Sequence, residues 1–214
     1  MKGENGSIPA FARDILRTLE AAGSEAYCVG GCVRDTLLGR TPGDWDITTS
    51  ARPEETLALF GADALPTGLR HGTVTVRRPD GSAEVTTFRR DGDYTDHRHP
   101  ESVAFTDSLT EDLARRDFTV NAMALSLRGE LRDPFHGRED LAAGCIRCVG
   151  EPVRRFGEDA LRILRGLRFA AVLGFQIEPE TAAALSAARE DLRAIAPERI
   201  LTEVRKLLTA ERPS

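Results

Sequence analysis

The sequence predicts an α/β (α+β) domain, with a small mixed sheet and helices, followed by an all-helical segment. In the first half, short apolar stretches alternate with helical stripes, whereas the pattern from Leu109 onward is almost entirely helical. Gly150-Glu151-Pro152 interrupts the helical part. We therefore expect one domain over residues 1–150 and a second over residues 151–214.

The first half begins with a helix over 8–22, because Phe11, Ile15, Leu16 and Leu19 form an apolar stripe that Gly23 ends. The further elements expected there are strands over 26–29, 45–49, 73–77 and 83–89, helices over 33–38 and 53–60, and a polar loop over 91–100. In the second half we expect helices over 109–117, 120–127, 138–143, 158–173, 179–188 and 197–210, and a strand over 145–149.

Composition excludes several classes of protein. The 214 residues are 41% hydrophobic and carry a net charge of −5, which excludes a disordered chain and argues against indiscriminate coating of nucleic acid. No apolar run is long enough to span a bilayer, and the N-terminus has no secretory signal. We expect a cytoplasmic protein that does not bind membranes.

The cysteines allow two interpretations. Cys28 and Cys32 have three residues between them, and Cys145 and Cys148 have two, so the four thiolates could together form a zinc site. The surrounding residues are apolar or strand-like, whereas a zinc site needs a turn between paired ligands. Buried free thiols are therefore the favoured interpretation.

Gly30-Gly31 lies between a predicted strand and a predicted helix. Two glycines let backbone N–H groups approach an anion, and Arg34 adds a guanidinium for a bidentate phosphate contact. The same dipeptide also suits an ordinary tight turn.

Three acidic residues are candidate metal ligands. Asp44 and Asp46 are two residues apart near a predicted strand, which brings two hard oxygen donors for Mg²⁺ to the same face. Glu84, on another predicted strand, is either a surface residue or a third acid of the same site. Metal ions held there would activate a hydroxyl and stabilise a pyrophosphate leaving group.

Two further clusters carry charge in patterns that suit a nucleotide. Arg115 and Arg116 would clamp a triphosphate or ribose, and Asp117 and Asn121 would orient them; the alternative is a helix end with salt bridges. Charged residues also recur every three positions along one predicted helix, either as a solvated face or as a base-reading edge. These residues are Asp159, Arg162, Arg165 and Arg168.

Asp159 and Arg162 fit the base-reading interpretation. Cytosine and adenine both present an exocyclic amine beside a ring-nitrogen acceptor, and uracil and guanine invert that pattern. A carboxylate that accepts from the amine, beside an arginine that donates to the ring nitrogen, would select C and A.

These motifs, in this order, resemble the bacterial-type (class II) tRNA nucleotidyltransferase and poly(A) polymerase family of the DNA polymerase β superfamily. The resemblance covers about residues 26–175 continuously. It implies a polymerase-β-like head and a helical neck, with Asp44 and Asp46 on catalytic Mg²⁺ and Glu84 as the further acid. It also implies that Gly31 and Arg34 contact the triphosphate.

The resemblance extends to sugar, base and loop. Arg116, with Arg115 and Asp117, would hold the sugar and phosphates, and Asp159 and Arg162 would be the protein template for CTP and ATP, with Arg165 and Arg168 nearby. Residues 97–100 would lie in the loop that helps the site switch from C to A. Family members are usually about twice this length, so we expect weak binding of whole tRNA.

The predicted function is template-independent addition of CMP and AMP from CTP and ATP to the 3′ end of tRNA. A poly(A) polymerase, or an enzyme that adds only C or only A, is the alternative within the family. A nucleotide-binding or RNA-end-binding module without catalysis is an alternative of another class. The sequence makes no prediction of oligomeric state.

Overall fold

The computed structural model describes residues 8–92 and 103–209, and these residues form two compact units. Of the described residues, the first unit contains 8–90, 103–115 and 121–134, and the second contains 91–92, 116–120 and 135–209. The predicted boundary between residues 150 and 151 lies inside the second unit and stays a prediction. Within the described ranges, no helix is both long and apolar enough to cross a membrane.

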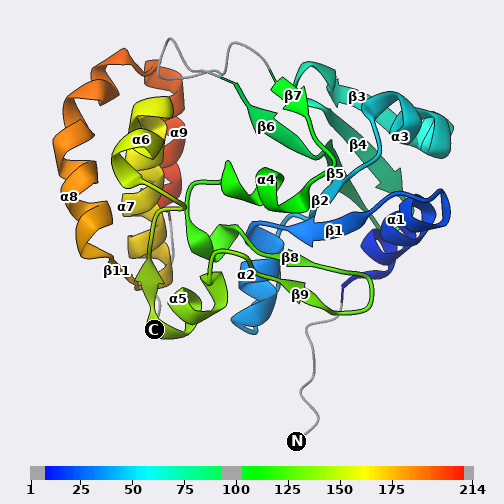
Figure 1. Ribbon diagram of the computed structural model, residues 1–214, viewed down its shortest axis with the longest axis horizontal. Coiled ribbons are helices and arrows are strands. Elements are labelled where there is room, and N and C mark those ends of the chain that lie inside the picture. Colours follow the sequence, from blue (N-terminus) through cyan, green and yellow to red (C-terminus); the bar gives the residue numbers. More distant parts are fainter. Residues whose placement is uncertain (1–7, 93–102, 210–214) are drawn as a thin grey trace, which may run out of the picture. The chain divides into compact units, whose positions relative to one another are not determined.

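The first unit is built on a seven-stranded mixed sheet with the order β3-β4-β5-β2-β1-β8-β9 (Figure 1). Its strands are β1 (Ala26–Val29), β2 (Asp46–Thr49), β3 (Ala64–Gly68), β4 (Thr73–Arg78), β5 (Gly81–Thr87), β8 (Ala124–Leu125) and β9 (Leu131–Arg132). β2 and β5 run parallel, and the other neighbours are antiparallel. A separate ribbon pairs β6 (Arg89–Asp91) with β7 (Val103–Phe105).

Helices of the first unit cover the sheet with apolar side chains. They are α1 (Ala10–Ala21), α2 (Gly31–Leu37), α3 (Pro53–Phe60) and α4 (Leu109–Ala114). Ile15, Leu16 and Leu19 of α1 are fully buried, as the apolar stripe in the sequence predicts. α1 and α3 contact each other and the sheet, and they lie side by side in Figure 1.

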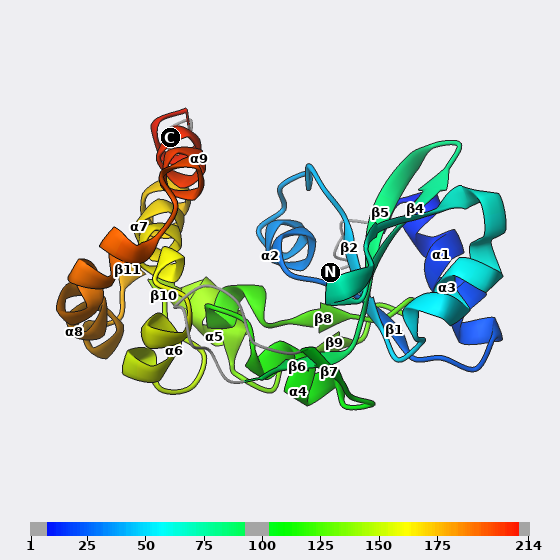
Figure 2. The ribbon, with the colours of Figure 1, turned by 90° about the horizontal axis from the view of Figure 1, so that it is seen from above.

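The second unit is mainly helical, and Figure 2 shows its helices from a second direction. Its elements are α5 (Gly137–Ala143), β10 (Cys145–Ile146), α6 (Pro152–Glu158), α7 (Leu161–Leu173), β11 (Gln176–Ile177), α8 (Pro179–Ala187) and α9 (Pro197–Leu208). α7 packs on α9, and α6 packs on α8. Phe156 and Ile163 are buried between these helices, so the unit has a core of its own.

The helix predicted over 120–127 is wrong. Residues Thr119–Asn121 form a single 3-10 turn, and Ala124–Leu125 form β8, which pairs with Cys28 and Val29 of β1. Apolar residues in this stretch gain more from completing the sheet than from a helix, because Met123 and Ala124 are fully buried there.

The helix predicted over 158–173 is interrupted. Asp159 has an extended backbone between α6 and α7, and its Oδ1 accepts a hydrogen bond from the backbone N–H of Leu161 at 3.0 Å. An aspartate that bonds the backbone two residues ahead competes with helical hydrogen bonding, and Gly157 weakens the helix just before it. Asp159 therefore does not share a helix with Arg162, Arg165 and Arg168.

The preference for free thiols agrees with the structure at three of the four positions. Cys28, Cys32 and Cys148 are buried, whereas Cys145 is only half-buried. Burial raises the pKa of the Cys148 thiol to about 12. A thiol with that pKa is almost entirely protonated at neutral pH, as expected for a small apolar core residue.

Candidate active site

The three predicted acids lie along one cavity of the first unit. The cavity has a volume of about 600 Å³, and its acidic lining residues are Asp44, Asp46, Asp80 and Glu84. Asp44 lies in the bend before β2, and Asp46 is the first residue of that strand. Asp46 is in register with Glu84 on the parallel neighbour β5.

The lining of this cavity is strongly acidic. The described residues that line it include no arginine, lysine or histidine. Carboxylates that face one another across such a space generate a negative potential that attracts cations, and their hard oxygen atoms suit a small divalent ion. In the described part of the chain, however, no three His, Cys, Asp or Glu side chains already converge at metal-binding distance. The donor chemistry of the lining nevertheless fits a divalent metal.

The predicted phosphate-binding turn lies between β1 and α2. Gly30 has φ 76° and ψ −135°, a conformation that glycine adopts readily, and α2 begins at Gly31. The Arg34 guanidinium is mostly buried and donates to Asp35 Oδ1 at 2.9 Å and to Asn121 Oδ1 at 2.7 Å. Asn121 thus orients Arg34. The sequence had instead led us to expect that Asn121 orients Arg115 and Arg116.

The Arg115-Arg116-Asp117 segment is divided between the two units. Arg115 belongs to the first unit, and its Nε donates to Asp112 Oδ1 at 2.9 Å. Arg116 and Asp117 belong to the second unit, where Arg165 Nε donates to Asp117 Oδ2 at 2.6 Å. Burial raises the pKa of Asp117, but the Arg165 guanidinium, together with Arg162 and the hydrogen bond from the Phe118 backbone N–H, holds that pKa below its ordinary value.

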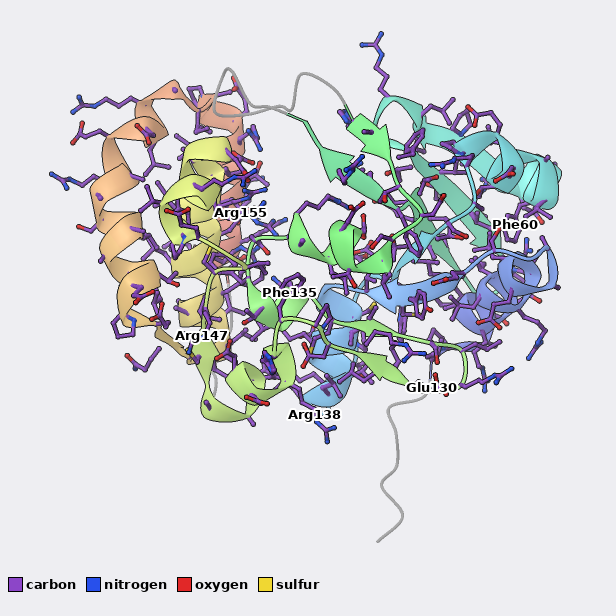
Figure 3. The ribbon with its side chains drawn as sticks, viewed as in Figure 1. Phe60, Glu130, Phe135, Arg138, Arg147 and Arg155 are labelled. Carbon is purple, nitrogen blue, oxygen red and sulfur yellow. The ribbon has the colours of Figure 1, made fainter. Side chains whose placement is uncertain are left out.

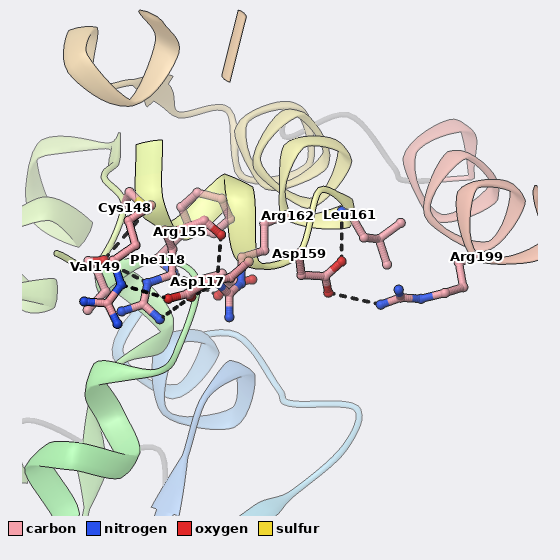
Figure 4. Close-up of polar contacts among 11 residues, drawn as sticks. Asp117, Phe118, Cys148, Val149, Arg155, Asp159, Leu161, Arg162 and Arg199 are labelled. Carbon is pink, nitrogen blue, oxygen red and sulfur yellow. Dashed lines mark hydrogen bonds and ion pairs between the residues drawn. The ribbon is translucent and has the colours of Figure 1, made fainter. Parts of the chain in front are cut away.

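Asp159 and Arg162, the predicted base-reading pair, have different partners in the second unit (Figure 4). Asp159 Oδ2 accepts from Arg199 Nη2 at 3.1 Å. Arg162 is buried, and its Nη1 donates to Glu158 Oε2 at 2.7 Å and to the Arg155 carbonyl at 2.8 Å. The positions of Arg155 and Arg147 among the side chains can be followed in Figure 3.

The remaining residues of the predicted ridge are held by other acids. Arg168 Nε donates to the buried Glu203 of α9 at 2.6 Å, and its guanidinium lies 4.1 Å from the centre of the Phe169 ring. Arg165 therefore joins α7 to the segment at Asp117, and Arg168 joins α7 to α9. The interpretation of this ridge as a simple solvated face is wrong. The loop residues 97–100 lie outside the described residues.

Sequence reasoning missed Asp112. Its side chain is completely buried, and it pairs with Arg115 three residues later. A signal was available, because an acid three positions before an arginine, among apolar residues of a predicted helix, is typical of a buried ion pair.

The fold and site together define a nucleotidyltransferase-type head followed by a helical region. Residues 26–147 match the poly(A) polymerase head domain, and residues 174–214 match the probable RNA- and SrmB-binding site of polymerase A. The chain belongs to the class II CCA-adding enzyme and poly(A) polymerase family.

Curated relatives support this membership. The chain is 49% identical to the CCA-adding enzyme of Oceanobacillus iheyensis over 203 residues, which cover 95% of this chain and 50% of that protein. It is 50% identical to the CCA-adding enzyme of Geobacillus stearothermophilus over 197 residues, which cover 92% and 48% of the two chains. The chain thus spans about half the length of the curated relatives it matches.

Solved structures also support membership of this family. The Bacillus stearothermophilus CCA-adding enzyme in complex with CTP superposes with a TM-score of 0.85 at 46% identity, over 92% of this chain and 47% of that one. The Thermotoga maritima CCA-adding enzyme complexed with tRNA gives a TM-score of 0.79 at 28% identity, over 98% and 50%.

Proposed function

We propose that this chain carries the nucleotide-binding and catalytic residues of a tRNA nucleotidyltransferase that adds CMP and AMP, from CTP and ATP, to the tRNA 3′ end. The observation that carries the proposal is the register pair Asp46 and Glu84 beside Asp44 in an acid-lined cavity. Relatives that are about 50% identical to this chain and are named CCA-adding enzymes support it.

In this proposal Asp44 and Asp46 hold Mg²⁺, and Glu84 is the further acid of the site. When bound, the metal would stabilise charge on the phosphoryl oxygens and favour the ionised form of the attacking hydroxyl. Membership of a family of nucleotidyltransferases that use a divalent metal supports this assignment. The acidic, oxygen-rich lining of the cavity supports it independently.

The chain's own residues would bind and orient the nucleotide. The backbone at Gly31 and the guanidinium of Arg34 would contact the triphosphate, and Asn121 would keep that guanidinium in place. Arg115, Arg116 and Asp117 would hold the sugar and phosphates. Positioning of this kind, together with charge stabilisation, supplies most of the catalysis in phosphoryl transfer.

Base selection would reside in the second unit. Asp159 would accept a hydrogen bond from the exocyclic amine of C or A, and Arg162 would donate to the ring nitrogen, with Arg165 and Arg168 nearby. Because Asp159 bonds Arg199 and Arg162 bonds Glu158, nucleotide binding in this proposal adds to or replaces those contacts. Domains at 1–150 and 151–214 and a cytoplasmic location are part of the same proposal.

The test is incorporation into a tRNA that ends at its discriminator base. The chain is supplied in excess over the tRNA, so that affinity does not limit the product, with Mg²⁺ and CTP alone, ATP alone, or both. We expect two cytidines with CTP alone and CCA with both nucleotides. Repeated adenylation with ATP would support a poly(A) polymerase, and nucleotide binding without any product would support a non-catalytic module.

A further inference from the structure

Asp112 carries a completely buried carboxylate in the first unit. Its exposed fraction is 0%. It lies on α4, well after the cavity-lining acids in the sequence. Oδ2 accepts from Thr48 Oγ1 at 3.1 Å, and Oδ1 accepts from the backbone N–H of Arg89 at 3.3 Å and from Arg115 Nε at 2.9 Å. A buried charge is tolerated only with such partners.

One of these contacts reaches the strand that bears the candidate metal ligand. Thr48 is two residues after Asp46 on β2, so the two side chains point to the same face of the sheet. Thr48 is in register with Thr86 on β5, as Asp46 is with Glu84, one repeat further along the same two strands. The Asp112 carboxylate is therefore attached about 7 Å along the strand from the acid pair.

The other main contact reaches Arg115 at the end of α4. The Arg115 side chain is 16% exposed, whereas its partner is fully enclosed. A hydrogen bond at Nε fixes the plane of a guanidinium, because the other nitrogen atoms are rigidly conjugated with it. Asp112 thus links the direction of the Arg115 guanidinium to the strand that carries Asp46.

We propose that Asp112 is a positioning residue that holds Arg115 in the direction needed to contact the nucleotide's phosphates. This inference rests on the proposed function, in which Arg115 binds the nucleotide. It adds that the charge of a residue without nucleotide contact of its own determines phosphate affinity. If Asp112 served only to stabilise the fold, its substitution would not weaken phosphate binding selectively over binding of the base.

The test compares ligands with and without phosphates. The full chain and its Asp112→Asn variant, which keeps the shape and the acceptor oxygen but removes the charge, are titrated with CTP plus Mg²⁺ by calorimetry and with cytidine by ligand-observed NMR. We expect CTP binding to weaken about tenfold and cytidine binding to stay unchanged. Arg115→Met should show the same selective loss, and the double variant should lose nothing further.

Asp140 provides a matched control. It is a buried aspartate of the second unit that accepts from Thr119 Oγ1 at 2.7 Å and from Arg147 Nε at 3.1 Å, so it shares the threonine and arginine partner types of Asp112. Asp140→Asn should leave CTP affinity within a factor of about two. Folding of each variant is verified by thermal melting.

The outcomes separate this inference from the proposed function. If the parent chain binds no CTP, the proposed function fails, and the inference fails with it. If the parent binds CTP but Asp112→Asn does not weaken it, or weakens cytidine equally, only the inference is overturned. Should Asp112→Asn not fold, Arg115→Met decides: unchanged CTP affinity in that variant overturns the inference, and a selective loss supports it.

Discussion

The cavity of the first unit, called the sheet unit below, and the candidate base-reading region of the second unit, called the helical unit, differ in how their acidic residues are paired. In the sheet unit, Asp44 and Glu84 line a cavity, and neither has an ion-pair partner among the described residues. In the helical unit the acids of the candidate site are held by arginines, as in the pairs of Asp117 with Arg165 and Asp159 with Arg199. The first arrangement is suited to a cation supplied from outside, whereas the second neutralises its charge internally.

This difference separates two kinds of molecular recognition. Carboxylates without internal partners gain strongly when a divalent ion arrives, because the ion removes their mutual repulsion. Paired groups gain only the difference between old and new hydrogen bonds when a base arrives, but that difference depends strongly on which groups the base presents. The sheet unit is therefore suited to reactivity, and the helical unit to discrimination.

Asp46→Ala gives the largest expected effect. Loss of a metal ligand should remove several kcal/mol of transition-state stabilisation, which corresponds to roughly a thousandfold slower transfer. Stability should change little, because the side chain lies at a cavity surface. Single-turnover transfer and thermal melting measure the two quantities.

Asp80→Ala is the matched control for that variant, since it removes another acid from the same cavity. It should retain most of the activity. If Asp46→Ala remains active while folded, the cavity is not the metal site, and the contrast between the two units loses its basis.

Asp159→Ala gives the next largest expected effect. UTP would place a carbonyl oxygen opposite the Asp159 carboxylate, and each mismatched group in a desolvated site costs about 1–3 kcal/mol. The variant should therefore reduce the preference for CTP over UTP by roughly tenfold to a hundredfold, with a smaller effect on overall triphosphate affinity. Competitive incorporation of the four nucleotides measures this preference.

Arg199→Gln sharpens the same experiment, because it removes the partner of Asp159 and leaves the carboxylate in place. It should keep the preference for CTP. An Asp159→Ala protein that discriminates as well as the parent would show that the base is read elsewhere, and that the Asp159–Arg199 pair is structural.

Asp117→Asn should have a smaller effect, on stability. The bond from Arg165 at 2.6 Å joins a buried carboxylate to a partly exposed guanidinium, so its loss should cost about 2 kcal/mol of unfolding free energy. Because the folded-state pKa of Asp117 lies below its unfolded value, this contribution is complete above the unfolded pKa near 4 and is lost as pH falls through the lower, folded pKa.

Urea unfolding at a series of pH values between about 2 and 7 tests this pH dependence. The parent should lose more stability in acid than Asp117→Asn does. Glu190→Gln, which breaks the exposed pair with Arg193, should cost less than about 0.5 kcal/mol. Equal losses in the two variants would mean that burial does not distinguish the pairs of the helical unit.

Much of the sheet unit could be predicted from sequence. The apolar stretch 26–29, the proline at residue 53 and the turn at residues 79–81 are local signals, and the elements they predict agree closely with β1, α3 and the β4–β5 hairpin. The edge strands β3 and β9 and the short β8 were missed or mistaken for helix. Their conformation depends on pairing with distant strands, which local periodicity does not register.

The candidate site divides in the same way. Motifs on one short segment, such as Asp44 and Asp46, are visible in the sequence together with the chemistry they suit. The partners of charged residues are not, because Asn121 reaches Arg34 across 87 positions and Arg165 reaches Asp117 across 48. Sequence spacing thus identifies which groups are present, and only the fold decides which of them are paired.

The approach of α1 to the β4–β5 hairpin has a consequence for redesign. A Cβ atom at Gly81 would lie 2.7 Å from the ring of Phe11, and both residues line the acidic cavity. A side chain at position 81 therefore requires the Phe11 ring to move or position 11 to become smaller. To enlarge or reshape this cavity, positions 11 and 81 should be varied together in one mutant library that includes shorter side chains at position 11. Varying one position at a time would miss the combinations in which the two side chains fit each other.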